Sequence, residues 1–405
     1  MHLSPSLGQL TYCSNIHPGE RFSEIENNLK QYLPAVKAAV SPDTPFGVGL
    51  RLSAQAVAEL MAIEGAIATL KRNLDEAGLY VFTLNGFPYG PFHGTPVKDQ
   101  VYRPDWRSDE RLQYSNRLAE VLCDLLPPTS GGTISTVPGA YKAHVSGDED
   151  RALIRTQLVR HAAYLYKLEE TRGRCIALAL EPEPCCLLET IAETTDFFRT
   201  ALFDERSISE FAALTGNTRS FSAELLPRYL GVCLDTCHAA VEFEDPASLL
   251  QALRDAHVDI KKMQLSAGLR VPQVNATHIS ALADYADPVY LHQVVERRDN
   301  VLHRYTDLDE AMQAFRKRSD EGDETACEWR IHFHVPIFLR DTPPFENTQD
   351  FLETLLRLHR KSPFTEHLEV ETYTWSVLPK PLQTGDLVSS IVRELSWARD
   401  ILCNS

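Results

Sequence analysis

The sequence predicts an α/β protein of the (β/α)8 TIM-barrel type, formed as a single domain over residues 1–405. Short apolar stretches rich in β-branched and aromatic residues alternate with longer stretches of helical periodicity along most of the chain. An apolar fraction of 43% is enough for a large core. Since no repeat, low-complexity tract or Pro/Gly-rich linker divides the chain, one elaborated barrel is the simplest arrangement.

Nine stretches have the composition of parallel strands, one more than a barrel of eight strands needs. We expect the surplus stretch to be 331–336, which would lie in an excursion outside the barrel wall. The nine expected strands are 10–15, 46–52, 79–86, 133–138, 175–181, 230–235, 261–266, 331–336 and 367–373.

Helical patterns separate these strands, and several have clear start or stop signals. The pattern over 107–126 stops before Pro127-Pro128, and the pattern over 148–171 opens with acidic residues and closes at Gly173. The expected helices are 54–76, 107–126, 148–171 and 347–360. The long irregular regions 87–106 and 267–300 are expected to form active-site loops or lids, so the domain would carry long loop insertions near 87–106 and 267–330.

Charge and composition exclude several classes of protein. The 40 basic and 56 acidic residues give a net charge of −16 without any Lys/Arg block, which disfavours a nucleic-acid partner. Nothing approaches the roughly 18 continuous apolar residues of a spanning helix, so no membrane insertion is expected. The first residues do not have the pattern of a secretory signal, and the nine scattered cysteines form no disulfide framework. We therefore expect a cytoplasmic protein.

Acidic or amide side chains close several expected strands. Glu181, Asp235 and Glu371 each stand at a strand end, and Gln264 stands late in the stretch 261–266. The C-terminal ends of barrel strands carry the chemistry in this architecture, and buried ionised carboxylates are costly unless a cation neutralises them. His238 follows Asp235 by three positions, so the two could form half of a divalent metal site. Alternatively, Asp235 caps the next helix, His238 is an incidental loop residue, and Glu181 pairs with an arginine at the rim.

Three further histidines have both a functional and a structural interpretation. His17 would sit at the barrel mouth, either as a ligand or substrate contact or as the donor of a loop-fixing hydrogen bond. His332 and His334 flank Phe333 and so face the same side of their stretch, with one expected to be functional and the other structural.

Other polar and aromatic side chains could contact a substrate at the rim. Arg330 and Lys142 could meet an anionic group, although a solvated surface charge is the more frequent case. Tyr89, Phe92 and Tyr141 lie in Gly/Pro-rich loops, where they could stack on a ring or anchor the loops.

These residues resemble a known pattern. Glu181, the Asp235-x-x-His238 pair and Glu371 match the xylose isomerase-like TIM-barrel superfamily, which includes sugar isomerases and epimerases and endonuclease IV-type enzymes. The string Cys-Leu-Asp-Thr-Cys-His at 233–238 resembles the endonuclease IV-type motif. More narrowly, the segments 10–20, 332–338 and 369–375 are similar to the EboE-type metabolite traffic proteins.

The superfamily resemblance implies a site in which Glu181, Asp235, a seventh-strand residue and Glu371 surround one divalent cation. The seventh-strand residue is commonly histidine, whereas here the matching residue is Gln264. A glutamine oxygen favours Mg²⁺ or Mn²⁺ over Zn²⁺, which is the less favoured cofactor. Alternatively, His334 takes that place, or the metal has been lost.

The resemblance also implies three functions. In the isomerase and epimerase branch, Glu181 and Glu371 move a proton on and off carbon, and His238 holds a substrate hydroxyl; His17, His93 and His332 are further candidate substrate contacts.

In the endonuclease branch, His93, His238 and His332 or His334 would complete a multi-zinc centre for phosphodiester hydrolysis, against which the acidic net charge and Gln264 speak. The EboE-type similarity implies a protein that binds or processes a small precursor metabolite for export, in association with other proteins of that pathway.

Overall fold

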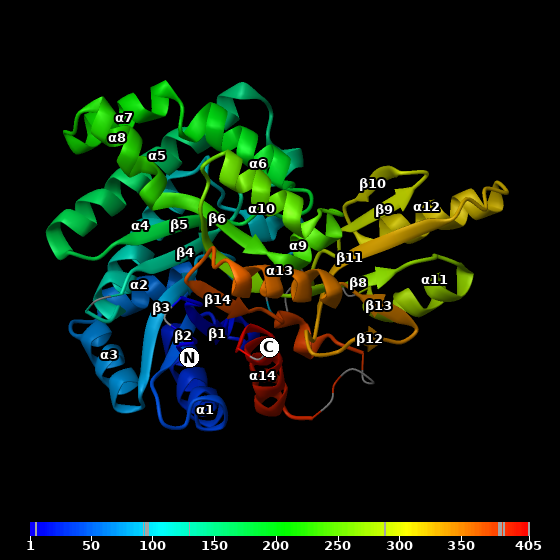
Figure 1. The fold of residues 1–405 in the computed structure, drawn as a ribbon, viewed down its shortest axis with the longest axis horizontal. Coiled ribbons are helices and arrows are strands. Elements are labelled where there is room, and N and C mark those ends of the chain that lie inside the picture. Colours follow the sequence, from blue (N-terminus) through cyan, green and yellow to red (C-terminus); the bar gives the residue numbers. More distant parts are fainter. Residues whose placement is uncertain are drawn as a thin grey trace.

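The computed structural model describes residues 1–4, 6–91, 93, 97–128, 130–286, 289–379, 383 and 385–403. Its barrel strands are β1 (Gln9–Tyr12), β2 (Phe46–Arg51), β3 (Leu79–Asn85), β4 (Gly132–Thr136), β5 (Ile176–Leu180), β6 (Leu230–Asp235), β7 (Ile260–Leu265) and β14 (His367–Val370). They pair in parallel in the order β1-β14-β7-β6-β5-β4-β3-β2. The two end strands meet where Cys13 and Gly49 form a parallel bridge, so the sheet is a nearly closed barrel (Figure 1). The predicted (β/α)8 barrel is confirmed.

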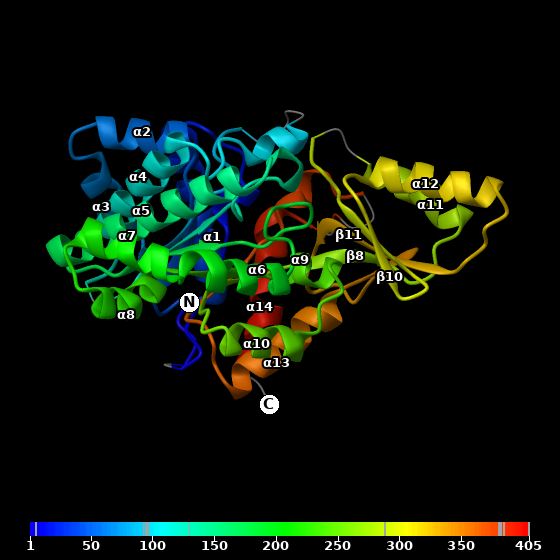
Figure 2. The same cartoon turned by 90° about the horizontal axis from the view of Figure 1, so that it is seen from above.

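Helices cover the outer face of this barrel (Figures 1 and 2). They are α1 (Phe22–Val40), α2 (Ala54–Ala62), α3 (Ala66–Glu76), α4 (Asp109–Leu125), α5 (Asp148–Arg172), α6 (Ile191–Phe197), α7 (Glu205–Thr215), α8 (Arg219–Tyr229), α9 (Thr236–Val241), α10 (Pro246–Asp255), α13 (Gln349–Lys361) and α14 (Leu387–Cys403). The helix α1 buries an apolar stripe of Ile25, Leu29, Leu33 and Val36. No helix in the described ranges is both long and apolar enough to cross a bilayer.

The expected helix 54–76 is wrong in one respect, because the structure has two helices there. Gly65 has φ +73°, a left-handed conformation that glycine adopts without strain, and it separates α2 from α3. The expected helices 107–126, 148–171 and 347–360 correspond to α4, α5 and α13.

An insertion between β7 and β14 builds a second sheet. Its elements are β8 (Ala267–Val271), α11 (Ala276–Leu282), β9 (Val294–Arg298), β10 (Val301–Tyr305), α12 (Leu308–Asp320), β11 (Cys327–Val335), β12 (Asp341–Thr342) and β13 (Phe345–Asn347). The strands pair in the order β10-β9-β11-β8-β13-β12, and all of these neighbours are antiparallel. This sheet projects from one side of the barrel, as Figure 2 shows.

The insertion settles which of the nine expected strands is surplus. The stretch 331–336 falls within β11, outside the barrel wall, as predicted. The expectation of loops over 267–300 is wrong, because β8, α11 and β9 lie there. Apart from β11, the strands of the insertion have five residues or fewer, and β10 is largely solvent-facing, so their apolar pattern in the sequence is weak.

The barrel interior holds a fully buried ion pair below the C-terminal ends of the strands. The ammonium Nζ of Lys262 on β7 lies 2.5 Å from Oε2 of Glu369 on β14. Gly49 on β2 makes this possible, since a Cβ there would fall 1.7 Å from Oε1 of Glu369. Burial alone would lower the pKa of Lys262, but the Glu369 carboxylate raises it above its usual range.

Candidate functional site

Three carboxylates from separate strands meet at the C-terminal end of the barrel. Glu181 follows β5 directly, Asp235 ends β6, and Glu371 follows β14 directly. One oxygen from each lies within 4.8 Å of an oxygen of the other two, and all three side chains are buried. The structure therefore brings together the three residues on which the sequence-based site depended.

Asp235 uses its two oxygens differently. Its Oδ1 accepts hydrogen bonds from the backbone N–H groups of Cys237 (2.8 Å) and His238 (3.1 Å), which caps α9, and from Oγ of Ser266 (2.6 Å). Its Oδ2 is buried and has no hydrogen-bond partner among the described residues. Asp235 can therefore cap α9 through Oδ1 and still offer Oδ2 to a metal ion.

The two glutamates are held by side-chain amides. Nε2 of Gln264 donates to Oε1 of Glu181 at 2.6 Å. Nδ2 of Asn15 and Nδ2 of Asn85 donate to Oε1 of Glu371 at 2.7 and 3.0 Å. These donors fix the carboxylates without adding a positive charge, so the negative charge of the cluster is left for another group to neutralise.

A histidine from the inserted sheet reaches the same place. His334 on β11 donates from Nδ1 to the backbone carbonyl oxygen of Glu371 at 2.5 Å, which leaves Nε2 as a lone-pair acceptor 4.0 Å from Oδ2 of Asp235. A metal-binding histidine has this arrangement, with one nitrogen fixed by a hydrogen bond and the other open.

Unpartnered atoms show that these residues fit a cation. Among the described residues, four buried atoms of the predicted ligand set have no hydrogen-bond partner: Oε2 of Glu181, Oδ2 of Asp235, Oε1 of Gln264 and Nε2 of His334. Buried polar atoms are normally satisfied, and each of these is a donor type that divalent metals accept. Both Gln264 and His334 therefore stay in the candidate ligand set.

The electrostatics of the cluster agree with this fit. Burial, with Asp235 adding to it, raises the pKa of Glu181 to about 8, and burial with Glu181 and Asp235 nearby raises the pKa of Glu371 well above its usual range. Burial acts the same way on Asp235, but His238 and His334 hold its pKa below the ordinary value. Lys262 reduces the rise at both glutamates without cancelling it.

A second polar group borders the first. Nδ1 of His238 donates to the Pro182 carbonyl oxygen (2.9 Å), and Nδ1 of His332 donates to Oε1 of Gln293 (2.7 Å), so the two Nε2 atoms face each other at 3.0 Å. Burial opposes protonation of both rings, yet carboxylates led by Asp235 raise the pKa of His238, whereas that of His332 is well below normal. His238 is therefore the donor in this pair. Glu183 offers a carboxylate oxygen within 4.8 Å of their ligand atoms.

Glu183 is fixed by a network from three parts of the chain. The Tyr102 hydroxyl donates to Oε1 of Glu183 at 2.6 Å, and Nε2 of Gln293 donates to that hydroxyl at 2.9 Å. Because Gln293 and His332 belong to the insertion, the second sheet supplies part of the site rather than decorating the barrel.

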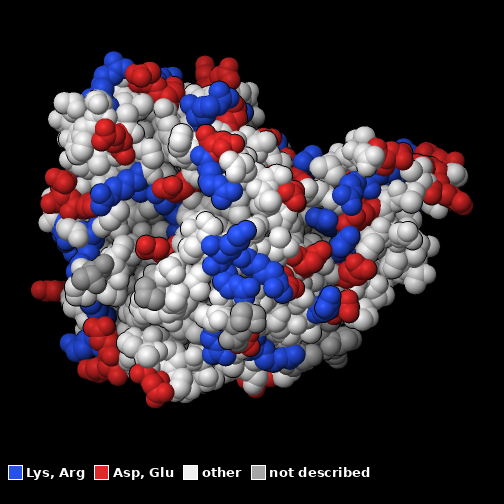
Figure 3. Space-filling view, in the orientation of Figure 1, with Lys and Arg blue, Asp and Glu red and all other residues white. Residues whose placement is uncertain are grey.

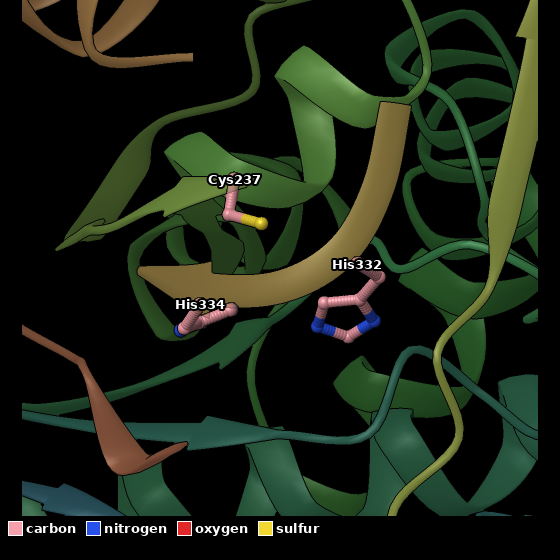
Figure 4. Close-up of side chains that lie close together, drawn as sticks. All are labelled: Cys237, His332 and His334. Carbon is pink, nitrogen blue, oxygen red and sulfur yellow. The ribbon is translucent and has the colours of Figure 1, made fainter. Parts of the chain in front are cut away.

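Cys237 is close to both β11 histidines but lies in a different environment. In Figure 4 its thiol and the rings of His332 and His334 are on opposite sides of the β11 ribbon. Cys237 packs in a small apolar cluster with Val241 and Val295. We therefore assign it to the core and not to the ligand set.

Two of the candidate histidines lie away from the carboxylates. His17 stacks on Tyr32 with ring centroids 4.1 Å apart, and its Nε2 is hydrogen bonded to the Tyr12 hydroxyl at 3.0 Å, contacts that fit the loop-fixing reading. His93 joins the Asn15 carbonyl oxygen (2.6 Å) to the Tyr290 hydroxyl (2.9 Å). Neither His17 nor His93 lines the pocket that lies above the three carboxylates.

The rim candidates are also engaged elsewhere. Arg330 pairs with Glu328 and lies over the ring of Phe243, and Lys142 pairs with Glu189 and Glu193.

Of the aromatic candidates, Tyr89 packs edge-on against Tyr114 and Tyr141 stacks on Tyr102, which are loop-anchoring contacts. Phe92 lies outside the described residues.

The pocket above the cluster has a cavity volume of about 70 Å³. Its polar side is formed by Asn15, Asn85, Glu181, Glu183, His238 and Glu371. Asn15, Asn85, Glu183 and Lys262 were not singled out from the sequence. Asn15 is the last residue of the expected strand 10–15, and Asn85 is the last but one of the expected strand 79–86. The position at a strand end that pointed to the carboxylates would therefore also have pointed to these two amides.

Comparisons with known proteins establish the fold. No family model and no curated protein matches this chain. Among solved structures, a xylose isomerase-like TIM barrel protein from Mycobacterium smegmatis in complex with magnesium matches with TM-score 0.51 and 10% identity over 100% of this chain and 99% of that one.

Two further solved structures cover nearly the whole chain. A structure of L-ribulose 3-epimerase matches with TM-score 0.46 and 14% identity over 98% and 94% of the two chains. The IOLI protein with a binding zinc atom matches with TM-score 0.45 and 13% identity over 97% and 98%. At 10% identity, the likeness to the Mycobacterium smegmatis protein shows the fold alone, and the class that it defines is the TIM barrel.

Proposed function

We propose that this protein is a divalent-metal-dependent enzyme of the isomerase or epimerase type that acts on a small polyhydroxy metabolite. The observation that carries the proposal is the buried cluster of Glu181, Asp235 and Glu371, beside which unpartnered ligand atoms converge. Glu181, Asp235 and Glu371 would hold the cation with Gln264 and His334. Mg²⁺ or Mn²⁺ suits this oxygen-rich set best, and Zn²⁺ is the less favoured alternative.

The cation would supply Lewis-acid stabilisation of negative charge that develops on substrate oxygens. The protein's own groups would move the proton. Glu181 and Glu371 both reach the pocket surface, where their carboxylates can face a substrate carbon as general acid and base. One would remove a proton from a substrate carbon, and the other would return one. His238 and Glu183, on the adjoining wall, would hold substrate hydroxyls.

The test is exchange of a carbon-bound proton with solvent. The metal-loaded protein is incubated in deuterated water with a panel of ketoses, aldoses and cyclic polyols, and each compound is examined by mass spectrometry and NMR. Deuterium incorporation at one carbon, lost in Glu371→Gln, supports the proposal. A compound that is converted without incorporation of deuterium would contradict proton transfer through these glutamates.

A second candidate is a metal-dependent phosphoester hydrolase, favoured by the Glu183, His238 and His332 cluster next to the first. It would need two or more metal equivalents per chain, whereas the isomerase-type site needs one. On the face of the molecule drawn in Figure 3, acidic and basic side chains are interspersed and form no continuous basic band, which gives a nucleic-acid backbone little to bind there.

The sequence similarity to EboE-type proteins supports a narrower version of the proposal. On that version the metabolite is a precursor handled for export, by a cytoplasmic protein that works with other components of the pathway. The same ligand cage would serve a protein that only binds the metabolite, and detection of turnover separates these two cases.

A further inference from the structure

The pocket has a second half with a different chemistry. Beyond the polar groups at the strand ends, it is lined by apolar side chains from two segments that meet above the barrel. Phe87, Val97 and Val101 come from the connection between β3 and α4, and Leu291 comes from the insertion just before β9.

These apolar side chains are only partly covered. Phe87, Val97, Val101 and Leu291 are each half-buried although they line a concave surface. Apolar area left facing water in a pocket is stabilised when a ligand covers it, and pockets of this kind typically bind the apolar part of a small molecule.

Contacts with neighbouring residues hold this apolar wall of the pocket in place. The ring of Phe87 stacks on Tyr102 with centroids 5.6 Å apart, and Tyr290 packs against Tyr373 at 5.3 Å. The backbone N–H of Val97 bonds to the Val289 carbonyl oxygen at 3.4 Å, which joins the two segments directly. A wall fixed before binding loses little conformational freedom when a ligand arrives.

The charge of the pocket limits what that ligand can carry. Lys98 is the only lysine or arginine among the described lining residues, and its Nζ lies 2.6 Å from Oδ2 of Asp307 and 2.8 Å from the Tyr290 carbonyl oxygen. At this end of the pocket, a phosphate or carboxylate on the substrate would have to displace Asp307 from Lys98. A neutral substituent avoids that cost.

We propose that the substrate is an uncharged, amphipathic polyol, with a polyhydroxy head over the carboxylate cluster and an aryl or short alkyl substituent against Phe87, Val101 and Leu291. This rests on the proposed function for the position of the head. The proposal adds a binding site for the substituent, and it excludes phosphorylated sugars as substrates.

The test compares two probes that share a vicinal diol and differ in the substituent, butane-1,2-diol and 4-phenylbutane-1,2-diol. Affinities for the metal-loaded full chain are measured by NMR titration. Burial of one phenyl ring predicts at least about tenfold tighter binding of the aryl diol. Leu291→Asn and Val101→Asn should each remove most of that preference, with a much smaller effect on the affinity for butane-1,2-diol and no change in the metal content.

Matched controls are Leu153→Asn and Val301→Asn, which change leucine and valine residues that are 49% and 53% exposed on other surfaces; they should keep the preference. Equal affinities for the two probes, or no binding of the aryl diol at millimolar concentration, would overturn the inference. Since the apolar wall does not need the metal, an aryl preference retained by a protein that binds no cation would contradict the proposed function alone.

Discussion

His334 and Glu371 are joined by a hydrogen bond from Nδ1 of the imidazole to the backbone carbonyl oxygen of the glutamate, at 2.5 Å. His334 belongs to the inserted sheet and Glu371 to the barrel, so this contact ties the insertion to the carboxylate cluster. It also fixes the tautomer that leaves Nε2 open towards Asp235. This contact predicts how metal binding responds when His334 is replaced.

His334→Ala should weaken divalent-metal binding by about 10- to 100-fold, because it removes an aligned ligand atom. Gln264→Ala should have the smaller effect, since the neutral amide oxygen is the weaker ligand and the amide also serves as a donor to Glu181. Binding is measured by competition with a chelating dye. His359→Ala is the control, as this buried histidine bonds the Leu7 carbonyl oxygen far from the site. A larger loss in Gln264→Ala would reverse the assignment.

The metal-free protein should lose stability as the pH rises from about 6.5 to about 8. Burial raises the pKa of Glu181 and of Glu394 to about 8 and that of Glu242 to about 7, from an ordinary 4.5. In this window the native state keeps protons that the unfolded chain has lost, so the free energy of unfolding falls with pH.

Buried histidines set the lower limit of that window. Burial lowers the pKa of His161 and His367 to about 3, so below about 6.5 these two rings take protons only in the unfolded chain and contribute a slope of the opposite sign. Thermal unfolding at a series of pH values checks both slopes. Added Mn²⁺ should flatten the decline above pH 6.5, because a cation takes the place of the protons on Glu181 and Glu371. A melting temperature that increases from pH 6.5 to 8 without metal would contradict this account.

The buried ion pair of Lys262 and Glu369 should respond differently to single and double substitution. Lys262→Met leaves a buried carboxylate without its partner and should cost about 3–5 kcal/mol of unfolding free energy. The double variant Lys262→Met with Glu369→Gln should recover much of that loss. Denaturant unfolding of the two variants gives the comparison. If the double variant is no more stable than the single one, Lys262 contributes through packing and not through its charge.

Glu371→Gln should reduce solvent exchange at the substrate carbon by about 10²- to 10⁴-fold, the usual contribution of a general acid or base. The amide keeps the shape of the side chain, so the melting temperature should change little. Glu369→Gln together with Lys262→Met serves as the comparison for a glutamate on the same strand that points into the barrel. Unchanged exchange in Glu371→Gln would remove its assigned role.

The barrel was predictable because its strands are buried on both faces, so Leu79–Asn85 and Leu230–Asp235 stand out as apolar runs with turn residues around them. The carboxylates at strand ends were predictable for the same reason, since position along a strand fixes which end of the barrel a side chain reaches. The second sheet was not, because β9 and β10 are short and partly exposed.

Contacts between distant parts of the chain were also beyond the sequence. Tyr102, Glu183 and Gln293 form one network although every two of them lie more than 80 residues apart in the sequence. The left-handed Gly65 that divides one expected helix had no signal beyond its residue type. The sequence left open whether Gln264 or His334 completes the ligand set. Their hydrogen bonds to Glu181 and Glu371 show that both side chains lie at the carboxylate cluster.

The most direct test of the central claim is the metal content of the purified protein, measured by elemental analysis after incubation with Mn²⁺ and desalting. The account predicts about one equivalent per chain in the wild type and a near-complete loss in Asp235→Asn, whose amide can still cap α9 but cannot neutralise a cation. A wild-type protein without bound metal, or an Asp235→Asn variant that retains the full equivalent, would contradict it.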